Sequence, residues 1–259
     1  MSEPGEQSNQ RAWSALTLML DGATIRRLEA LGVAPGWRCL EVGAGVGSIA
    51  AWLGERVGAA GRVLATDRTT ELLDGVARAN VEVLQHDVTT EEFPAGEFDL
   101  VHARWVIHWL PQPELALERM VRALRPGGWL LVEEPDFVTC LHGASSQALA
   151  RVMASAVDVG AKAKGIDNFL GRRLPQMLQR LDLADRGEEG CVPTIRGGAP
   201  ASGAEWLQIS LRWLEAPLVA QGRVSRPDFA EALACLDDPG FTTLGPLTMA
   251  VWGRRPQHP

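Results

Sequence analysis

A run of glycines between two apolar stretches is the part of this sequence best suited to bind a cofactor. Glu41 precedes three glycines at alternate positions, Gly43, Gly45 and Gly47, and the apolar segment 49–53 follows. Glycine reaches backbone conformations closed to other residues, and without a Cβ it lets a ligand approach main-chain N–H groups. The pattern predicts a strand, a tight turn and a helix start that hold a nucleotide-like cofactor. The dinucleotide fingerprint is G-x-G-x-x-G, so this G-x-G-x-G spacing departs from it.

The elements that must position this loop are strands and helices in alternation. Five strand–helix repeats fill the first 135 residues, which predicts a doubly wound parallel sheet with a ligand at the carboxyl ends of its strands. The predicted strands cover 39–42, 62–66, 81–85, 99–102 and 129–133. One predicted helix ends near residue 57, and two others cover 69–79 and 114–124.

The segments on either side of these repeats have a helical pattern. Residues 1–10 are expected to be a frayed tail, and apolar residues in 13–31 fall at helical spacing, with Gly22 as a possible division between two helices. Beyond residue 136 we expect helices, two of them forming a lid, and two strands that complete the sheet; residues 197–203 suit a flexible connection. These helices are predicted over 144–163, 171–183, 203–220 and 226–236, and the strands over 190–196 and 241–252.

Composition excludes several classes of protein. The chain has 259 residues, of which 46% are hydrophobic, enough for one large α/β domain. The net charge of -7 argues against a nucleic-acid partner, because phosphates are bound by clustered Lys and Arg. Four cysteines without C-x-x-C spacing predict neither a zinc cluster nor a disulfide framework, and no metal is expected. Without a signal peptide or a membrane-length apolar run, the sequence predicts a soluble cytoplasmic protein.

Several motifs in one order resemble a known family. They are Glu41-x-Gly43-x-Gly45-x-Gly47, Asp67 at the end of the second strand, Asp87 after the third, the segment 98–101, and Leu-Arg-Pro-Gly-Gly at 124–128. This series resembles the S-adenosylmethionine-dependent methyltransferases of the seven-stranded Rossmann-like class, over residues 33–136. The resemblance implies an α/β fold whose sheet ends in a reversed seventh strand, with a helical lid insertion. The implied segments are N-terminal lid helices at 1–32, the core at 33–136, a helical lid and substrate region with one returning strand at 137–240, and a final strand at 241–259.

The resemblance also implies the residues that contact the S-adenosylmethionine cofactor. The glycine loop would pass under the methionine portion, Glu41 would fix the loop or meet the ammonium group through water, and Asp67 would accept hydrogen bonds from the ribose hydroxyls. Arg68 would flank the adenine, and Asp87 would accept from the adenine amino group. A turn or helix-cap carboxylate is the alternative role for both aspartates. The implied set is Glu41, Gly43, Ala44, Gly45, Gly47, Asp67, Arg68, Asp87 and Val88, with the main chain of Ala103 and Arg104 at the ammonium group.

Methyl transfer needs alignment and sometimes a base for the acceptor. His108, after the fourth strand, and Glu134, at the end of the fifth, resemble in their places the histidine and the acid of small-molecule O-methyltransferases, although Glu stands where Asp is usual. His108 would take the hydroxyl proton and Glu134 would orient it. A histidine packed in the core is the alternative, and reaction without a base stays open. The residues predicted near the acceptor, including the competing candidates for the base, are Trp13, His102, Asp136 and His142.

The leading hypothesis is a methyltransferase of secondary metabolism that acts on a small hydrophobic acceptor, with O-methylation favoured over N- or C-methylation. A second hypothesis keeps the fold and the cofactor but catalyses a cyclisation or rearrangement. A third, an NAD(P)-dependent oxidoreductase, is opposed by the glycine register and by the missing Tyr-x-x-x-Lys pair. The only partner expected is the small acceptor, with no nucleic acid or membrane, for a monomer or homodimer.

Overall fold

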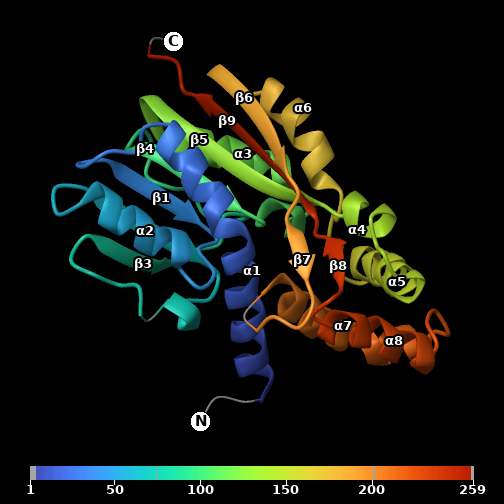
Figure 1. Cartoon of the computed structure of the whole chain (residues 1–259). Coiled ribbons are helices and arrows are strands. Elements are labelled where there is room, and N and C mark those ends of the chain that lie inside the picture. Colours follow the sequence, from blue (N-terminus) through green and yellow to red (C-terminus); the bar gives the residue numbers. More distant parts are fainter. Residues whose placement is uncertain (1–3, 74, 201, 258–259) are drawn as a thin grey trace. The chain divides into compact units, whose positions relative to one another are not determined.

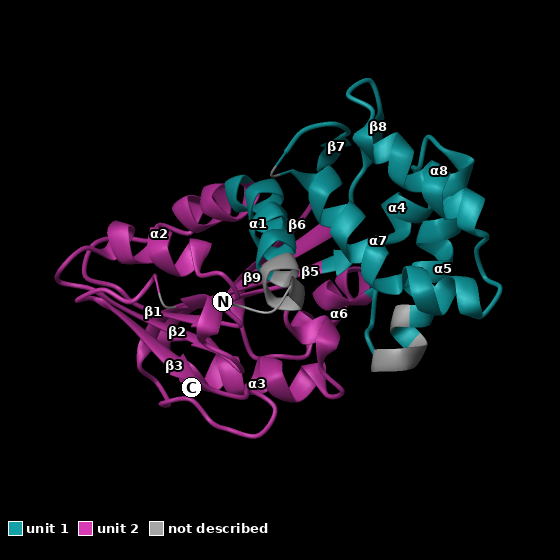
Figure 2. Ribbon diagram, turned by 90° about the horizontal axis from the view of Figure 1, so that it is seen from below, with its two compact units in different colours: residues 1–22, 135–169, 191–247 teal, residues 23–134, 170–190, 248–259 magenta. Residues whose placement is uncertain are grey.

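The computed structural model describes residues 4–73, 75–200 and 202–257. The chain divides into two compact units, shown in two colours in Figure 2. Unit 1 comprises residues 1–22, 135–169 and 191–247, and unit 2 comprises residues 23–134, 170–190 and 248–259. The outer ends of the predicted first and last segments, 1–3 and 258–259, lie outside the described residues.

Unit 2 is built on a seven-stranded sheet with the order β3-β2-β1-β4-β5-β9-β6 (Figure 1). Strands β1 to β5 run parallel, and Leu40 of β1 lies opposite Leu64 of β2 and Val101 of β4. Strand β9 runs antiparallel to β5. This direction is seen in the hydrogen bond at the end of β9, where the Arg255 N–H donates to the Gly128 carbonyl near the beginning of β5 at 2.9 Å. The strands are β1 (Arg38–Val42), β2 (Arg62–Asp67), β3 (Val81–Gln85), β4 (Phe98–Arg104), β5 (Leu124–Asp136), β6 (Ala184–Cys191) and β9 (Leu247–Arg254). The predicted α/β Rossmann-like sheet of seven strands with a reversed last strand is confirmed.

Both faces of this sheet are buried, as its apolar strands require. Neighbouring residues of a strand point to opposite faces, so Leu40 and Leu130 enter one core cluster while Cys39 and Leu131 enter the other. The first cluster includes residues of α3 (Pro113–Ala123) and α6 (Leu174–Gln179), and the second includes residues of α2 (Ser48–Val57). The described residues of this unit also form three short 3-10 helices: η1 (Glu71–Leu73), η2 (Ile107–Trp109) and η3 (Leu170–Arg173).

The helix predicted over 69–79 is wrong. Among the described residues of that segment only η1 is helical, and the chain then passes as a loop to β3; residue 74 is outside the described residues. The physical reason is close packing on the glycine loop, since a Cβ at Gly47 would overlap the side chains of Val76 and Leu73. The apolar residues that suggested a helix are therefore used to cover a loop.

The N-terminal segment is one helix, α1 (Pro4–Ala30), which begins in unit 1 and ends in unit 2. The prediction of a frayed tail is therefore wrong for residues 4–10, and the predicted division at Gly22 is wrong as well. Glycine within a helix costs only about 1 kcal/mol relative to alanine, which the rest of a long helix can offset.

In the described part of unit 1 there are four further helices and a small sheet. The helices α5, α7 and α8 pack on one another, and β7 (Thr194–Arg196) pairs with β8 (Thr242–Leu244) as an antiparallel ribbon. The helices are α4 (Val138–His142), α5 (Gln147–Lys164), α7 (Gly203–Ala220) and α8 (Arg226–Asp237), so three of the four predicted late helices are confirmed. The fourth predicted helix, 171–183, is replaced by two shorter elements, η3 and α6. The five-residue helix α4 was not predicted.

Each of the two predicted late strands is in fact a pair of strands. The segment 190–196 contains the end of β6 and all of β7, and 241–252 contains β8 and most of β9. Pro193 separates the first pair, and Gly245 with Pro246 separates the second; proline lacks the N–H that continues a ladder. One member of each pair joins the large sheet, as predicted, and the other joins the ribbon. No described helix is long and apolar enough to cross a membrane.

Candidate functional site

The glycine loop between β1 and α2 has the geometry expected of a ligand-binding turn. Gly43, Gly45 and Gly47 have φ angles of 67°, 58° and 77°, in the left-handed region that favours glycine. A Cβ at Gly43 would overlap Val106 and one at Gly47 would overlap Val76, so these two glycines serve packing. A Cβ at Gly45 would meet nothing within 4 Å. Gly45 is therefore the glycine that leaves open space beside the loop.

Asp67 is held against this open position. Its Oδ2 accepts the N–H of Gly45 at 2.9 Å, and its Oδ1 accepts the N–H of Thr69 at 3.3 Å. The Ala44 N–H donates to the Thr66 carbonyl at 2.9 Å, which fixes the loop to the end of β2. Each carboxylate oxygen can accept more than one hydrogen bond, so Asp67 keeps capacity for a ligand. Arg68 beside it is exposed.

Asp87, after β3, has the turn role that the sequence left as an alternative. Its Oδ1 accepts from the backbone N–H and the hydroxyl of Thr89 at 2.8 and 2.6 Å, and these bonds hold the pKa of Asp87 below its ordinary value. Any contact with an adenine amino group would therefore fall to Oδ2. Val88 is buried, and the His86 N–H donates to the Asp67 carbonyl at 2.8 Å, which joins the ends of β2 and β3.

The end of β4, where Ala103 and Arg104 lie, is followed by a strained residue. Trp105 has a φ of 58°, which is rare for a bulky side chain and is kept only where surrounding contacts enforce it. Its N–H donates to the Glu133 carbonyl at 2.8 Å, and its Nε1–H donates to Thr248 Oγ1 at 3.1 Å. Strained backbone at the carboxyl edge of a parallel sheet is typical of a functional turn.

The structure brings His108 and Glu134 together, as the sequence predicted. The His108 Nδ1 lies 2.7 Å from Glu134 Oε2, and both side chains are almost fully buried. The other carboxylate oxygen accepts the backbone N–H groups of Val106 and Ile107 at 3.0 and 2.8 Å. Glu134 is thereby fixed by the turn that carries His108, and its Oε2 can accept a hydrogen bond from the imidazole Nδ1–H. The longer Glu side chain thus reaches the histidine.

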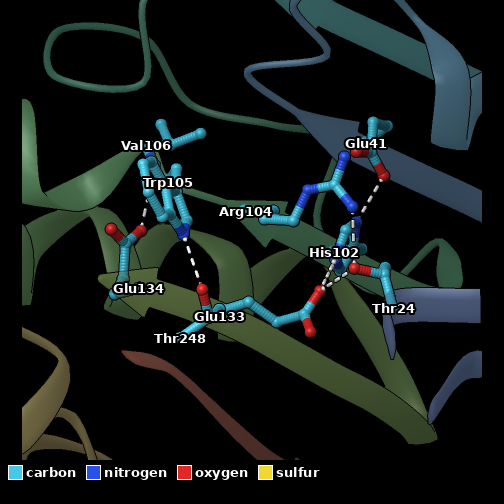
Figure 3. A network of polar contacts seen from close by, with 9 residues as sticks. All are labelled: Thr24, Glu41, His102, Arg104, Trp105, Val106, Glu133, Glu134 and Thr248. Atoms are coloured by element: carbon cyan, nitrogen blue, oxygen red, sulfur yellow. Dashed lines mark hydrogen bonds and ion pairs between the residues drawn. The ribbon is translucent and has the colours of Figure 1, made fainter. Parts of the chain in front are cut away.

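A second buried network surrounds His102 (Figure 3). The His102 Nδ1 lies 2.7 Å from Glu41 Oε2, and its Nε2 lies 3.1 Å from Glu133 Oε2. The Thr24 hydroxyl donates to Glu133 Oε2 at 2.7 Å and accepts from Arg104 Nη1 at 2.8 Å. Burial opposes the charged form of His102, but the two carboxylates raise its pKa to about 9. Burial also acts to raise the pKa of Glu133, yet His102 lowers it overall.

This network bears on two of the predicted residues, His102 and Glu41. Both ring nitrogens of His102 face carboxylates and the side chain is fully buried, so the predicted contact between His102 and the acceptor is not supported. Glu41 stands at the base of the glycine loop with its carboxylate on His102. Glu133 was missed, although two adjacent carboxylates in an apolar strand are costly unless partnered and could have signalled such a network.

The other residues predicted near the acceptor belong to unit 1. Trp13 is half-buried on α1, and His142 is exposed at the end of α4. Asp136 is buried, and its Oδ1 accepts the Val138 N–H at 2.9 Å at the start of α4. Their contacts with an acceptor stay predictions.

A doubly wound sheet with a reversed seventh strand, a glycine loop after β1 and an acid at the end of β2 define a Rossmann-like cofactor-binding domain. The family model described as "Methyltransferase domain" matches residues 40–132, which run from β1 into β5. Residues 40–132 are therefore similar to a methyltransferase domain, and the predicted resemblance to the class I, Rossmann-like methyltransferases that use S-adenosylmethionine is confirmed.

Similar proteins agree with this assignment. The ubiquinone/menaquinone biosynthesis C-methyltransferase UbiE of Pseudomonas fluorescens (strain SBW25) is 34% identical over 115 residues, which are 41% of this chain and 45% of that protein. The match spans 31 to 45% of the length of the first curated relatives.

Solved structures show the same fold at low identity. A structure from Bacillus halodurans C-125 has a TM-score of 0.61 at 17% identity and covers 90% of this chain and 99% of that one. The Haemonchus contortus phosphoethanolamine N-methyltransferase 2, solved with phosphomonomethylethanolamine and S-adenosylhomocysteine, has a TM-score of 0.54 at 17% identity and covers 86% of this chain and 50% of that one.

Proposed function

We propose that this protein transfers a methyl group from S-adenosylmethionine to a hydroxyl group of a small hydrophobic acceptor. The observation that carries the proposal is the pairing of Gly45 with Asp67, which places an open backbone position beside a carboxylate at the ends of β1 and β2. A polar cofactor with a ribose needs this combination of close backbone approach and hydrogen-bond acceptors.

The residues present fit the cofactor. Asp67 can accept from the ribose hydroxyls, the loop at 43–47 can pass under the methionine portion, and the turn after Ala103 can receive the ammonium group. Asp87 and the neighbouring Val88 flank the adenine in this assignment, with Arg68 at its exposed side. When bound, the cofactor supplies an electrophilic methyl group on a sulfonium, so the protein must align an acceptor in line with it and exclude water.

His108 is the group best suited to remove the acceptor proton. Because Glu134 can accept a hydrogen bond only from an Nδ1–H, the tautomer able to act as a base has its lone pair on Nε2, and no described residue hydrogen-bonds that nitrogen. A carboxylate that fixes the tautomer of a histidine is a recurrent arrangement for a general base. We therefore assign His108 as the base and Glu134 as the residue that orients it.

The surroundings of His108 support a hydrophobic acceptor. The ring of Trp105 meets the imidazole edge-on with centroids 6.1 Å apart, and Trp109, whose ring centroid is 5.1 Å away, is 40% exposed. Indole rings offer large apolar contact area to a planar ligand. One similar sequence is named a C-methyltransferase and one similar structure an N-methyltransferase. The proposal that the methylated atom is a hydroxyl oxygen therefore rests on His108.

The test combines binding with turnover. Calorimetry with S-adenosylmethionine, S-adenosylhomocysteine and NADH should show heat with the first two only, and mass spectrometry of candidate acceptors should show the gain of one methylene. His108→Ala should lower turnover by about 10²–10⁴ with cofactor affinity unchanged. Glu134→Gln should lower turnover less, and Glu114→Gln, at an exposed carboxylate, is the matched control.

Three results would contradict the proposal. Heat with NADH alone would favour the oxidoreductase hypothesis. Cofactor binding without methyl transfer to any acceptor, together with a rearranged product of unchanged mass, would favour the cyclisation hypothesis. If His108→Ala retained most of the turnover, His108 would be excluded as the general base.

A further inference from the structure

The network around His102 joins the two segments assigned to the cofactor (Figure 3). Glu41 lies in β1, two residues ahead of Gly43, at the entrance to the glycine loop. Glu133 lies in β5, and its main-chain carbonyl accepts the N–H of the strained Trp105. His102, in β4 between these strands, contacts both carboxylates through its two ring nitrogens. A single side chain therefore links the loop after β1 to the turn after β4.

The contacts determine the protonation of this ring. A neutral imidazole has one N–H, so its second nitrogen would turn a lone pair toward a carboxylate oxygen. At 2.7 and 3.1 Å from Glu41 and Glu133, both nitrogens of His102 must donate, and the ring is an imidazolium. The lowered pKa of Glu133 agrees that the proton resides on the ring.

The imidazolium then compensates the buried carboxylates. Glu41 and Glu133 each face one ring nitrogen of His102, and the Thr24 hydroxyl stands between Glu133 and Arg104. Buried ions cost several kcal/mol each unless they are paired and hydrogen-bonded, so this compensation is a condition of their burial. The titratable groups that face His102 are Glu41 from β1 and Glu133 from β5, and the Thr24 hydroxyl of α1 donates to Glu133.

We propose that His102 is a positioning residue for the cofactor: its imidazolium, held between Glu41 and Glu133, fixes the glycine loop relative to the Trp105 turn and neutralises the carboxylate nearest that loop. This inference rests on the proposed cofactor site. Its consequence is that cofactor affinity depends on a charge that never touches the cofactor. Loss of that charge should weaken binding, and removal of one opposing carboxylate should restore it.

Two variants and a control test the inference by calorimetry with S-adenosylhomocysteine between about pH 6.5 and 9.5. His102→Gln keeps one donor but removes the charge, and it should bind about 10-fold more weakly at neutral pH, a coupling of ordinary size. The wild type should lose affinity as the pH approaches 9, whereas His102→Gln should show no such loss. The double variant His102→Gln/Glu133→Gln restores charge balance and should recover most of the affinity. His86→Gln, at a buried histidine whose two ring nitrogens have no hydrogen-bond partner among the described residues, should keep the wild-type pH profile.

The outcomes separate the two proposals. If wild-type protein binds no S-adenosylhomocysteine at any pH, the proposed function fails, while histidine-selective NMR still tests whether both ring nitrogens of His102 are protonated at neutral pH. If the wild type binds and His102→Gln matches it in affinity and pH profile, the positioning role is wrong. Weak binding by His102→Gln without recovery in the double variant would refute the charge argument. Thermal melts of each variant show that the protein measured is folded.

Discussion

The wild-type protein should lose stability as the pH rises from about 6.5 to about 9, because folding raises the pKa of His102 from 6.5 to about 9. A group whose pKa is raised by folding stabilises the protein fully below its unfolded pKa, and this contribution disappears as the pH passes the folded value. Raising the pH therefore removes this stabilisation, because His102 loses its proton between the buried carboxylates of Glu41 and Glu133.

The magnitude follows from the size of the shift. One pKa unit corresponds to about 1.4 kcal/mol, so a shift from 6.5 to about 9 is worth on the order of 3 kcal/mol. His102 is fully buried, so solvent screening removes little of this energy. The opposite shift of Glu133 reports the same pair and is not added to it. Since natural domains are stable by about 5–15 kcal/mol, the loss is a large fraction of the total.

Comparison with a variant is needed to assign this loss to His102. The sequence contains no tyrosine, and its only lysines are Lys162 and Lys164. Burial raises the pKa of the Cys140 thiol to about 12 and also raises that of Cys39. The partly exposed thiols of Cys191 and Cys235 and the other histidines are present in both the wild type and His102→Gln, so the difference between these two proteins isolates His102.

Urea unfolding, repeated at every half pH unit between about pH 6 and 9.5, measures how the free energy of unfolding depends on pH. The free energy of unfolding of the wild type should fall by about 1.4 kcal/mol per pH unit inside the window. His102→Gln should be less stable at neutral pH and should lack this slope. A wild type with flat stability across the window, or the same slope in His102→Gln, would refute the assignment of a buried imidazolium.

Three further changes test the cofactor site and the lid. Asp67→Ala removes a charged acceptor and should weaken S-adenosylhomocysteine binding by about 10- to 100-fold, from about 1.5–3 kcal/mol; unchanged affinity in calorimetry would remove Asp67 from the site. Gly45→Ala should cost about 1–2 kcal/mol in urea unfolding because of its φ of 58°, and should also block binding, whereas Gly36→Ala, with a φ of 87° and open space, should lose stability alone. Deletion of residues 1–20, expected to contribute to the lid, should reduce turnover more than the melting temperature, and full activity in the truncated protein would contradict that role.

The fold was largely readable from the sequence because local pattern and packing agree in the sheet. The strands β1 to β4 are largely apolar runs, and each was placed within two residues of its observed bounds. Strand β5 is longer than predicted, 124–136 against 129–133, because the Arg-Pro-Gly-Gly segment expected as a turn belongs to it. The segment 69–79 failed because its apolar residues pack on Gly47, a tertiary contact that no local period reveals. The late strands failed in detail because Pro193 and Pro246 divide them between two sheets.

The contacts of the candidate site that follow from the order of strands along the chain could be predicted from the sequence. Those that depend on the register between strands could not. Gly45 and Asp67 follow the ends of neighbouring strands, so topology alone brings them together. The pairing of His108 with Glu134 was also predicted. The contact of His102 with Glu41 needed the register of β1 against β4, and that of Thr24 needed the path of α1, neither of which spacing gives.

The strand order also bears on how the protein is made. Strand β9 ends at Arg254, yet it lies between β5 and β6 in the interior of the sheet. Until residues 247–254 have left the ribosome, the nascent chain holds β5 with an unpaired edge, and such edges invite pairing with other chains. We therefore expect the sheet to close only after β9 has emerged, long after β1 to β5 have been synthesised. Truncation before residue 247 would remove a central strand and leave β5 and β6 without the strand that lies between them.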